Sequence, residues 1–528
     1  MKTISKLSFN EIESTPQLIK DFLNHQIKGF ENSTFSLDNF VQQIDAKQNS
    51  FDSSQREVIF NTFKDQLAGF RLSSKQEQNL ENLKLPNTFT ITTGHQLNLF
   101  SGPAFFIYKI LQTVKTCTHL KEKFPDFNFV PVYWMASEDH DFAEINHFKT
   151  ETHYYEINEK SGSAVGRIKI SDTFFISEFE NEFKDSIFGT ELILMLKEAY
   201  KIGNTLTEAI RTLVNRLFSE FGLLILDGDS RELKNQVKNI FKDELLHCSL
   251  EKISKEKIDL LTQRYGKVQV NPREINLFYL SDTRDRIDFD GEKYIVIDKN
   301  IQFTKEEILA ELEHFPERFS PNALMRPVYQ QKVLPNLAYI GGNAEIMYWL
   351  ELKDYFSALH IPFPVLIPRN SMLFLKEKTL KKIDKLNLKI DDFFQNFTKI
   401  TNAKILEDNL ILRSLEEKEN LIIDQFSTLK SLAEKTERSF GNLVKAEEVR
   451  QLRSFSRMKK RLLHAEKIKQ KELLERLEKL FLEIHPAKTW QERIYNFSVF
   501  FADYGYLWLE VCLEDMVAEE SKLIIVAI

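Results

Sequence analysis

Four short segments combine glycine, histidine, carboxylates and arginine in patterns that could bind an anion or an amine. The first is Thr93-Gly94-His95-Gln96, followed by Ser101-Gly102-Pro103 and by Lys109. Glycine allows a close backbone approach, a helix that starts near proline offers free N–H groups to an anion, and histidine can donate to a phosphate or a leaving oxygen. This segment therefore predicts an anion site, and a tight turn with a capping histidine is the alternative.

The second segment is Glu138-Asp139-His140-Asp141, with Glu144 and His147 downstream. Crowded carboxylates raise one another's pKa unless they share a cation or a proton, so the segment could bind a substrate directly. We expect the three neighbouring carboxylates to favour the positive form of His140. If the segment is helical, His140, Glu144 and His147 share one face and could hold a divalent metal. An acidic helix-capping turn with a hydrogen-bonded histidine is the third interpretation.

Two further segments follow predicted strands. Gly341-Gly342-Asn343-Ala344-Glu345 would present backbone N–H groups to an anion, and Glu345 could receive an amine. A glycine turn whose acid favours the helix start is the alternative. In Pro368-Arg369-Asn370-Ser371, Arg369 could make a two-pronged contact with a carboxylate or phosphate, or a structural ion pair.

An α/β sheet would position all four segments. The β-forming run 88–93, the helical periodicity of 104–120 and the apolar run 127–136 predict a βαβ unit with parallel strands. Further buried strands are expected at 222–227, 337–340 and 365–367, with small insertions at about 151–190 and 245–318. The body is therefore predicted to be a doubly wound α/β sheet. Ligands bind outside the carboxyl ends of such strands, so the four segments should converge on one crevice, which favours an enzyme.

The chain between Pro368 and Pro486 contains no proline and one glycine, Gly441, which predicts long helices. Apolar residues at four-three spacing predict a coiled coil at Ile422, Phe426, Leu429 and Ala433, and again at Leu473, Leu477, Leu480 and Ile484. We expect two antiparallel arms of about 35–40 residues that turn at Gly441-Asn442. Seam residues such as Leu473 and Leu477 would be partly exposed on an isolated arm, so we expect a homodimer.

This arm is also locally basic. Residues 441–480 hold 12 Lys and Arg against 6 Asp and Glu, which indicates either a solvated face or a surface for a nucleotide or partner. The expected domains are a core at 1–370, a helical coiled-coil domain at 371–490 and a C-terminal segment at 491–528 that packs on the core.

The composition is that of a globular protein, with 42% of 528 residues hydrophobic and 28% charged. A net charge of -7 gives no general attraction to nucleic acid or to an anionic membrane. The cysteines, Cys117, Cys248 and Cys512, are widely separated, and no apolar run approaches the roughly 18–20 residues of a membrane span. We expect a cytoplasmic protein with no nucleic-acid or membrane partner. The absence of G-x-S-x-G disfavours a serine hydrolase.

Longer motifs resemble one family. TGHQLNLFSGPAFFIYK, VPVYWMASEDHDFAEINH, LMRPVYQQKVLPNLAYIGGNAEIMYW and PRNS, followed by a long coiled coil and then by WQERIYNF and YG, are similar to the BshC family of cysteine-adding enzymes in bacillithiol biosynthesis. The resemblance spans nearly the whole chain in the same order. One departure is His95, where many members are expected to have glutamine.

The resemblance implies a Rossmann-like core related to class I aminoacyl-tRNA synthetases and nucleotidyltransferases, with two connecting insertions and a dimerising antiparallel coiled coil. It also implies a ligase that joins L-cysteine to the amine of glucosaminyl-malate to give bacillithiol. Forming an amide in water needs an activated acyl group, so ATP is the expected activating nucleotide, although the chain has no K-M-S-K-S loop of the synthetase type. No metal is predicted on this interpretation.

On this interpretation each segment has a role. The phosphate or oxyanion is assigned to Thr93, Gly94, His95 and Gln96, and to the helix start with Gly102, Pro103 and Lys109. Amine orientation and general base are assigned to Asp139, His140 and Asp141, completion of the pocket to Gly341, Gly342 and Glu345, and the malate to Arg369. Two alternatives remain open: a nucleotide-binding coiled-coil interaction protein without chemistry, and a metal-dependent hydrolase built on residues 138–141.

Overall fold

The computed structural model describes residues 1–160, 162–266 and 270–528, which form two compact units. The first unit contains residues 1–10, 15–374 and 490–528 and holds all four candidate segments. The second contains residues 11–14 and 375–489. Among the helices of the described residues, none combines the length and apolar character that a membrane span requires.

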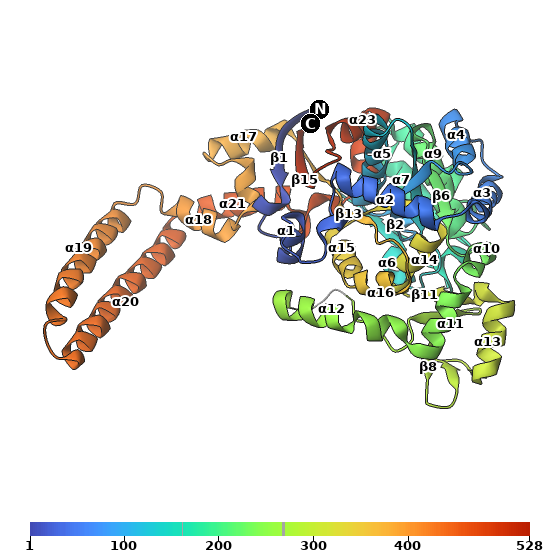
Figure 1. The fold of residues 1–528 in the computed structure, drawn as a ribbon. Coiled ribbons are helices and arrows are strands. Elements are labelled where there is room, and N and C mark those ends of the chain that lie inside the picture. Colours follow the sequence, from blue (N-terminus) through green and yellow to red (C-terminus); the bar gives the residue numbers. More distant parts are fainter. Residues whose placement is uncertain (161, 267–269) are drawn as a thin grey trace. The chain divides into compact units, whose positions relative to one another are not determined.

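A five-stranded parallel sheet forms the centre of the first unit (Figure 1). Its strands lie in the order β13 (Val365–Pro368), β12 (Asn336–Gly341), β2 (Thr88–His95), β3 (Asn128–Met135) and β6 (Leu224–Asp227). All neighbouring pairs are parallel, and Thr93 lies between Ile340 and Tyr133. In chain order the strands run 5-4-1-2-3, so the winding reverses between β2 and β12. This is the strand order of a Rossmann sheet, and the predicted parallel α/β body is confirmed.

Helices pack along this sheet. Helix α5 (Phe105–Lys123) contacts β2, β3 and β12, and α2 (Leu37–Ser50) contacts β12 and β13. Helix α3 (Ser53–Leu67) contacts β6 and starts at a capping box in which Asp52 and Gln55 satisfy each other's backbone N–H groups. Helices α4 (Ser74–Asn82) and α9 (Leu206–Phe218) also contact β6, and α15 (Asn343–Leu350) contacts β12 and β13. The first unit further contains α1 (Gln17–Leu23), α10 (Arg231–Asn235), α14 (Met325–Val333) and α16 (Lys353–Ala358).

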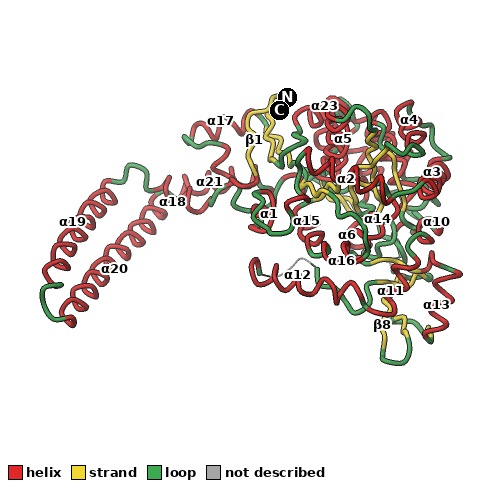
Figure 2. The backbone as a smooth tube through the Cα atoms, in the orientation of Figure 1, coloured by secondary structure: helices red, strands yellow, loops and turns green. Residues whose placement is uncertain are grey.

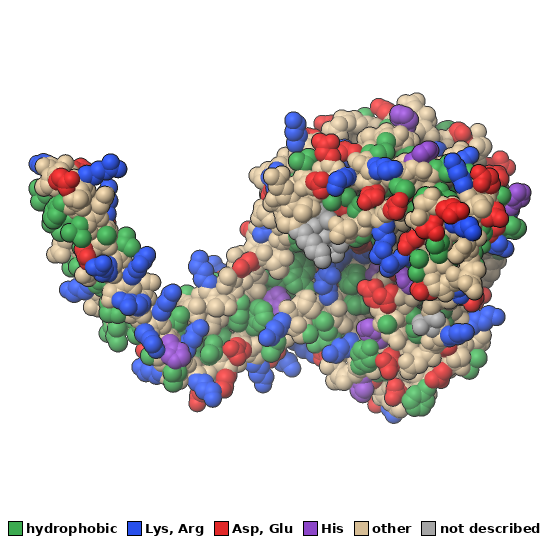
Figure 3. Space-filling view, turned by 90° about the horizontal axis from the view of Figure 1, so that it is seen from below, with side chains coloured by type: hydrophobic (Ala, Val, Ile, Leu, Met, Phe, Trp, Pro, Cys, Tyr) green, Lys and Arg blue, Asp and Glu red, His purple; other side chains and the backbone are tan. Residues whose placement is uncertain are grey.

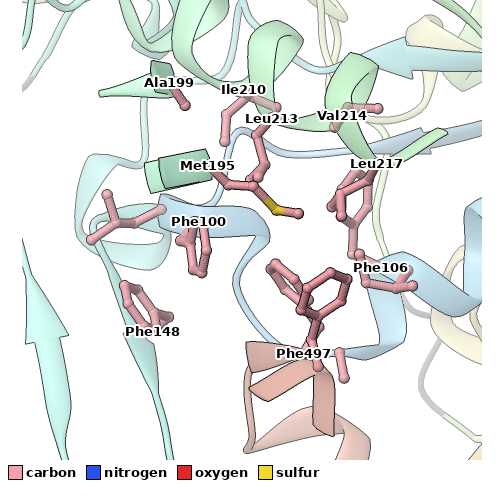
Figure 4. Close-up of a cluster of buried hydrophobic side chains, with 14 of the residues drawn as sticks. Phe100, Phe106, Phe148, Met195, Ala199, Ile210, Leu213, Val214, Leu217 and Phe497 are labelled. Atoms are coloured by element: carbon pink, nitrogen blue, oxygen red, sulfur yellow. The ribbon is translucent and has the colours of Figure 1, made fainter. Parts of the chain in front are cut away.

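The loop after β2 is anchored in a large hydrophobic cluster (Figure 4). The ring of Phe100 lies 5.0 Å from that of Phe497 and 5.5 Å from that of Phe148. Met195 of α8 (Gly189–Ala199) faces the same cluster. Three consecutive residues of the loop, 100–102, have positive φ, a conformation that persists where the surrounding packing holds it. The chain that follows β2 is therefore fixed by its buried phenylalanine.

Two insertions interrupt the sheet. The first contains α6 (Phe142–Ile145), the paired strands β4 (His147–Lys149) and β5 (Tyr154–Glu156), and α7 (Phe174–Phe183). The second contains α11 (Lys238–His247), α12 (Ser249–Tyr265) and α13 (Lys305–His314). It also builds an antiparallel sheet in the order β10 (Ile301–Phe303), β9 (Tyr294–Val296), β8 (Arg284–Phe289), β7 (Leu277–Leu280) and β11 (Phe319–Pro321).

The two chain ends lie side by side (Figure 1). Strand β1 (Lys2–Ser8) pairs antiparallel with β15 (Lys522–Ala527), which also neighbours β14 (Ser371–Leu375). Helix α23 (Tyr506–Asp515), which follows α22 (Ser498–Tyr504), packs against α5. Residues 490–528 thus complete the first unit.

The second unit carries a helical hairpin, α19 (Leu410–Ala433) and α20 (Arg438–Lys469), whose two helices run side by side in Figure 2. Ion pairs join Lys430 to Glu448 at 2.8 Å and Lys459 to Glu419 at 2.6 Å, so the helices are antiparallel. The predicted turn at Gly441-Asn442 is wrong, because the chain turns at 434–437. The carboxylate of Glu437 caps α20, and a helix interior tolerates a glycine at a cost of about 1 kcal/mol.

The second arm is also shorter than expected. Helix α20 ends at Lys469, and a separate α21 (Lys471–Ile484) packs against α17 (Glu377–Lys385) and α18 (Phe397–Ile405). Leu477 is 1% exposed there, so the expectation that it lies exposed on the arm is wrong. The hairpin instead exposes other apolar residues, which are Leu410, Ile411, Leu421, Ile423, Leu429, Leu432, Phe440, Leu443, Val449, Met458 and Ile468. Lys and Arg side chains line its visible face in Figure 3.

Candidate active site

The carboxyl ends of β2 and β12 meet where the winding of the sheet reverses, which is where such sheets bind ligands. Lys109 of α5 is 1% exposed, and its ammonium donates to the carbonyl of Gly94 and lies 2.7 Å from Glu345 Oε2. Glu345 also accepts hydrogen bonds from Gly342 N at 2.9 Å and from the Tyr339 hydroxyl at 2.7 Å. The structure thus brings the first and third predicted segments together.

The Lys109–Glu345 pair is ionised. Burial raises the pKa of Glu345, but Lys109 and the hydrogen bonds outweigh it and lower that pKa to about 2. Burial lowers the pKa of Lys109, and Glu345 opposes this. The amine that Glu345 receives is therefore that of Lys109, and neither group is free for a ligand while the pair is intact.

Arg326 is a cation at the same crevice that was not predicted from the sequence. It lies on α14, and its guanidinium donates to Gln330 Oε1 at 2.9 Å and to the Tyr348 hydroxyl at 3.1 Å. A Cβ atom on Gly94 would lie 3.2 Å from Arg326 Nη1, so glycine there lets the guanidinium approach the end of β2. No carboxylate of the described residues forms an ion pair with Arg326. It is therefore the best-placed group for an anion.

His95 lies beside this crevice. Its ring stacks on Phe106 with centroids 4.7 Å apart and meets the edge of Phe105 at 5.2 Å. Burial, and then the positive charge of Lys109, hold the pKa of His95 well below its usual value. Its buried Nε2 has no hydrogen-bond partner in the part of the chain that the structure describes. His95 is thus a neutral ring with one unsatisfied nitrogen.

The predicted helix start after Gly102 is covered. Helix α5 begins at Phe105, and the N–H of Ala104 donates to Tyr495 O at 2.8 Å. The side-chain amide of Asn496 donates to the carbonyls of Phe100 and Gly102 at 2.7 and 2.6 Å. Gly102 and Pro103 therefore lie against residues 495–496, and the structure does not show them as an open anion site.

The second predicted segment follows β3 and meets the first through Gln96. The amide of Gln96 donates to Asp139 Oδ2 at 2.8 Å and to Glu144 Oε2 at 2.9 Å. Asp139 also accepts from the backbone N–H groups of His140 and Asp141 at 2.7 and 3.4 Å. Burial raises the pKa of Asp139, but Gln96, Arg284 and these N–H groups lower it overall. Two carboxylates are thus held together beside the crevice, and Asp139 is ionised.

His140 has a different charge from the one expected. Its side chain is 45% exposed, and Nδ1 accepts a hydrogen bond from Arg284 Nη1 at 3.0 Å. Burial and the charge of Arg284 lower the pKa of His140, and the opposing effects of Asp139 and Asp141 are smaller. The prediction that its positive form is favoured is therefore wrong. Local spacing gave no signal for Arg284, which lies in the second insertion.

Glu138 belongs to a separate buried cluster. Its carboxylate accepts from Lys234, which is fully buried, and Lys234 lies 3.6 Å from Asp229. Asp229 also receives two hydrogen bonds from Arg167, at 2.8 and 2.9 Å. Burial raises the pKa of Glu138 to about 6, and Lys234 opposes this. These pairs fix the start of the loop that carries Asp139 and His140.

The helical metal site is not formed. Helix α6 ends at Ile145, and His147 is the first residue of β4, so the assumed shared helix face with His140 and Glu144 does not exist. His147 Nδ1 lies 3.1 Å from Asn146 Oδ1, and its ring stacks on Tyr154. Among the described residues, no group of three or more His, Cys, Asp or Glu side chains is arranged to hold a metal.

Two other predicted residues make internal contacts. Arg369 is 3% exposed and forms a double ion pair with Glu492, at 2.6 and 3.0 Å. This is the structural alternative to a malate contact. The Thr93 hydroxyl donates to Ile340 O at 2.8 Å and so joins β2 to β12. Both residues hold the site in place.

Comparisons with known proteins identify the family. Residues 3–370 match the family described as Bacillithiol biosynthesis BshC, N-terminal Rossmann-like domain, and residues 372–528 match its C-terminal coiled-coil domain. A relative in Flavobacterium johnsoniae is 42% identical over 516 residues, which are 97% of each chain. A relative in Christiangramia forsetii is 39% identical over 98% of this chain and 97% of its own, and one in Flavobacterium psychrophilum is 39% identical over 94% of each. All three bear the name "Putative cysteine ligase BshC". The chain belongs to the BshC family of bacillithiol biosynthesis.

Proposed function

We propose that this protein is the ligase that forms an amide between the carboxyl group of L-cysteine and the amine of glucosaminyl-malate. The names of its relatives support a cysteine ligase. The observation that carries the proposal is the juxtaposition, at one edge of the sheet, of a cation site and a carboxylate site. Arg326 lies against Gly94. Two residues further along the chain, Gln96 donates hydrogen bonds to both Asp139 and Glu144.

These two sites suit the two kinds of group that the reaction brings together. Arg326 would bind a carboxylate or phosphate through its planar guanidinium. Asp139 and Glu144 would hold an ammonium group, because Gln96 keeps both carboxylates in place with their remaining oxygen lone pairs free to accept. Glu345 is left out of amine binding, since Lys109 already occupies it.

We propose ATP as the activating co-substrate, because a carboxylate does not react with an amine in water without activation. The supporting residues are Arg326, which lies against Gly94, and the neutral ring of His95, whose buried Nε2 has no hydrogen-bond partner among the described residues. The relation of the core to class I synthetases is part of the same proposal, and the strand order 5-4-1-2-3 is compatible with it.

We also propose a homodimer joined through the hairpin α19–α20. Large apolar side chains such as Leu421, Leu432, Phe440 and Leu443 are between 50% and 53% exposed there, and a second copy of the hairpin could cover them. This contact replaces the one expected from Leu477, which its own chain buries.

The test is incubation of the purified protein with cysteine, ATP and glucosaminyl-malate, followed by mass spectrometry of the thiol product. We expect product only with all three present. Arg326→Met should lower kcat/KM about 100-fold by removing one charged contact worth roughly 2–3 kcal/mol. Asp139→Asn should mainly raise the KM of an amine-bearing substrate.

The result also separates the alternatives. If the protein binds ATP but forms no product with ATP or with any other nucleoside triphosphate, the ligase function is refuted. A nucleotide-binding interaction protein then remains. Product formation that requires an added divalent ion but no nucleotide would also contradict the proposal. Glu81→Gln, at an exposed ion pair with Lys84, is the matched control for charge removal and should leave kcat/KM unchanged.

A further inference from the structure

The second insertion contacts His140 at the candidate active site through Arg284 and through Phe278, whose ring centroid lies 5.6 Å from that of His140. Arg284 is the first residue of β8, opposite Leu280 of β7, and its backbone N–H donates to Gly162 O at 3.0 Å. Residues just beyond Gly162 bond to the loop after β3, with Val165 N donating to Asp139 O at 2.6 Å. The start of β8 is therefore tied to the loop that carries His140.

The guanidinium of Arg284 has a fixed orientation. It is 9% exposed and lies 3.9 Å from the ring centroid of Phe278. Nε donates to Ser320 Oγ at 3.0 Å and Nη2 to Pro321 O at 2.8 Å, both on β11. No carboxylate of the described residues forms an ion pair with it. A buried cation without an ion pair is costly, which argues that the remaining nitrogen has a specific task.

That remaining nitrogen, Nη1, donates to Nδ1 of His140. Guanidinium nitrogens cannot accept, so Nδ1 must be the acceptor and the neutral ring carries its proton on Nε2. A protonated His140 would direct a second N–H at Arg284 and bring two positive charges together. Arg284 therefore selects both the charge and the tautomer of the ring.

The other charged groups that face His140 shift its pKa in both directions. Arg286 of β8 lowers the pKa of His140, as Arg284 does, whereas Asp139 and Asp141 of its own loop raise it. Arg286 is exposed and makes no hydrogen bond to the ring in the described part of the chain. It acts through charge alone and is a natural control for Arg284.

We propose that Arg284 is a positioning residue that holds His140 neutral with its proton on Nε2, so that the ring offers Nε2–H as a hydrogen-bond donor to the bound substrate. His140 then does not accept the proton of the amine. That contact with substrate rests on the proposed ligase function, whereas the state of the ring does not.

Nuclear magnetic resonance of the full-length protein with ¹⁵N-labelled histidine tests the ring directly, with His140→Gln to assign its signals. We expect the Nε2–H tautomer at pH 7. In Arg284→Gln the ring should become a mixture of tautomers and titrate at higher pH, while Arg286→Gln should keep the Nε2–H tautomer. A wild-type ring protonated at Nδ1, or an Arg284→Gln spectrum identical to the wild type, would overturn the proposal.

Two further variants protect this test from a folding defect. Thermal unfolding shows whether Arg284→Gln is folded. Arg284→Lys keeps the charge but cannot reach Ser320, Pro321 and His140 at once, so it should also lose the single tautomer. If it keeps that tautomer, the positive charge alone suffices and the positioning role is refuted.

Kinetics then distinguish a donor from a base. The amide N–H of a glutamine can replace Nε2–H, so His140→Gln should retain turnover within about 10-fold, while His140→Ala should lose about 10²–10³-fold. A general base would make both variants about 10²–10⁴-fold slower, which would refute the donor role. If the spectra are as expected but no ligase turnover is found, the proposed function fails and the positioning by Arg284 stands.

Discussion

Replacement of Glu345 by glutamine tests the electrostatics of the buried pair at the sheet reversal. The pKa of Glu345 falls from its ordinary 4.5 to about 2 in the folded protein. At about 1.4 kcal/mol per pKa unit, this difference corresponds to roughly 3 kcal/mol of stability at neutral pH. The side chain is 25% exposed, so little of this is lost to solvent. In Glu345→Gln, Lys109 is left buried without its partner, so we expect the free energy of unfolding to fall by about 3 kcal/mol at pH 7.

The sign of the pH dependence follows from the lowered pKa. A carboxylate that is more acidic when folded stabilises the protein fully above pH 4.5 and progressively less as the pH falls toward 2. The difference between wild type and Glu345→Gln should therefore shrink by about 0.8 kcal/mol at pH 4 and by about 2 kcal/mol at pH 3.

Denaturant unfolding followed by tryptophan fluorescence measures this difference in unfolding free energy for the first compact unit alone. All four tryptophans, Trp134, Trp349, Trp490 and Trp508, belong to the first unit, so the signal does not report the hairpin. Glu81→Gln, in the exposed pair with Lys84, should change stability by less than about 1 kcal/mol at every pH. A Glu345→Gln difference that stays constant from pH 7 to pH 3, or that is no larger than the Glu81→Gln difference, would contradict the assignment.

Three further outcomes are expected. Glu492→Gln leaves Arg369 buried without its partner and should lower the free energy of unfolding by about 3–5 kcal/mol, with the KM of the proposed malate substrate unchanged in the folded fraction. A change in that KM without a loss of stability would favour direct binding of the substrate by Arg369. His147→Ala should lower turnover less than threefold, and a loss as large as that of His140→Ala would revive the metal site. A short linker in place of 410–469 should leave tryptophan unfolding unchanged and give a monomer in light scattering, whereas a persistent dimer would place the interface elsewhere.

The sheet could be predicted because each strand is a local pattern. Runs such as 222–227 are short, continuous and apolar, as expected of parallel strands covered on both faces. Most of this run forms β6. The hairpin turn could not be placed by the same reasoning. Gly441 has the lowest helix propensity of the residues in this stretch, but the cap formed by Glu437 decides where α20 begins. Capping depends on the geometry of one side chain, which composition does not show.

The candidate site shows the same division between local and distant contacts. Segment spacing predicted that residues 93–96 and 138–141 meet, because the carboxyl ends of adjacent parallel strands share one edge. It gave the wrong charge for His140, since the deciding donor, Arg284, is 144 residues away. The internal ion pair of Arg369 could not be predicted for the same reason, because its partner Glu492 lies 123 residues away. The pKa of a group depends on every charge within a few ångströms, whichever part of the chain supplies it.

In the proposed ligase, the ion pair of Lys109 and Glu345 would also limit where substrates bind. Its opposite charges cancel at the carboxyl ends of β2 and β12, so the pair attracts neither an amine nor a phosphate to that point. Arg326 then supplies the positive potential on the β12 side, and Asp139 supplies the negative potential on the β3 side. Because the two groups flank the same strand end, the proposed function would have an anionic and an amine-bearing group bound at once and facing each other. Such simultaneous binding is what lowers the entropic cost of joining two molecules.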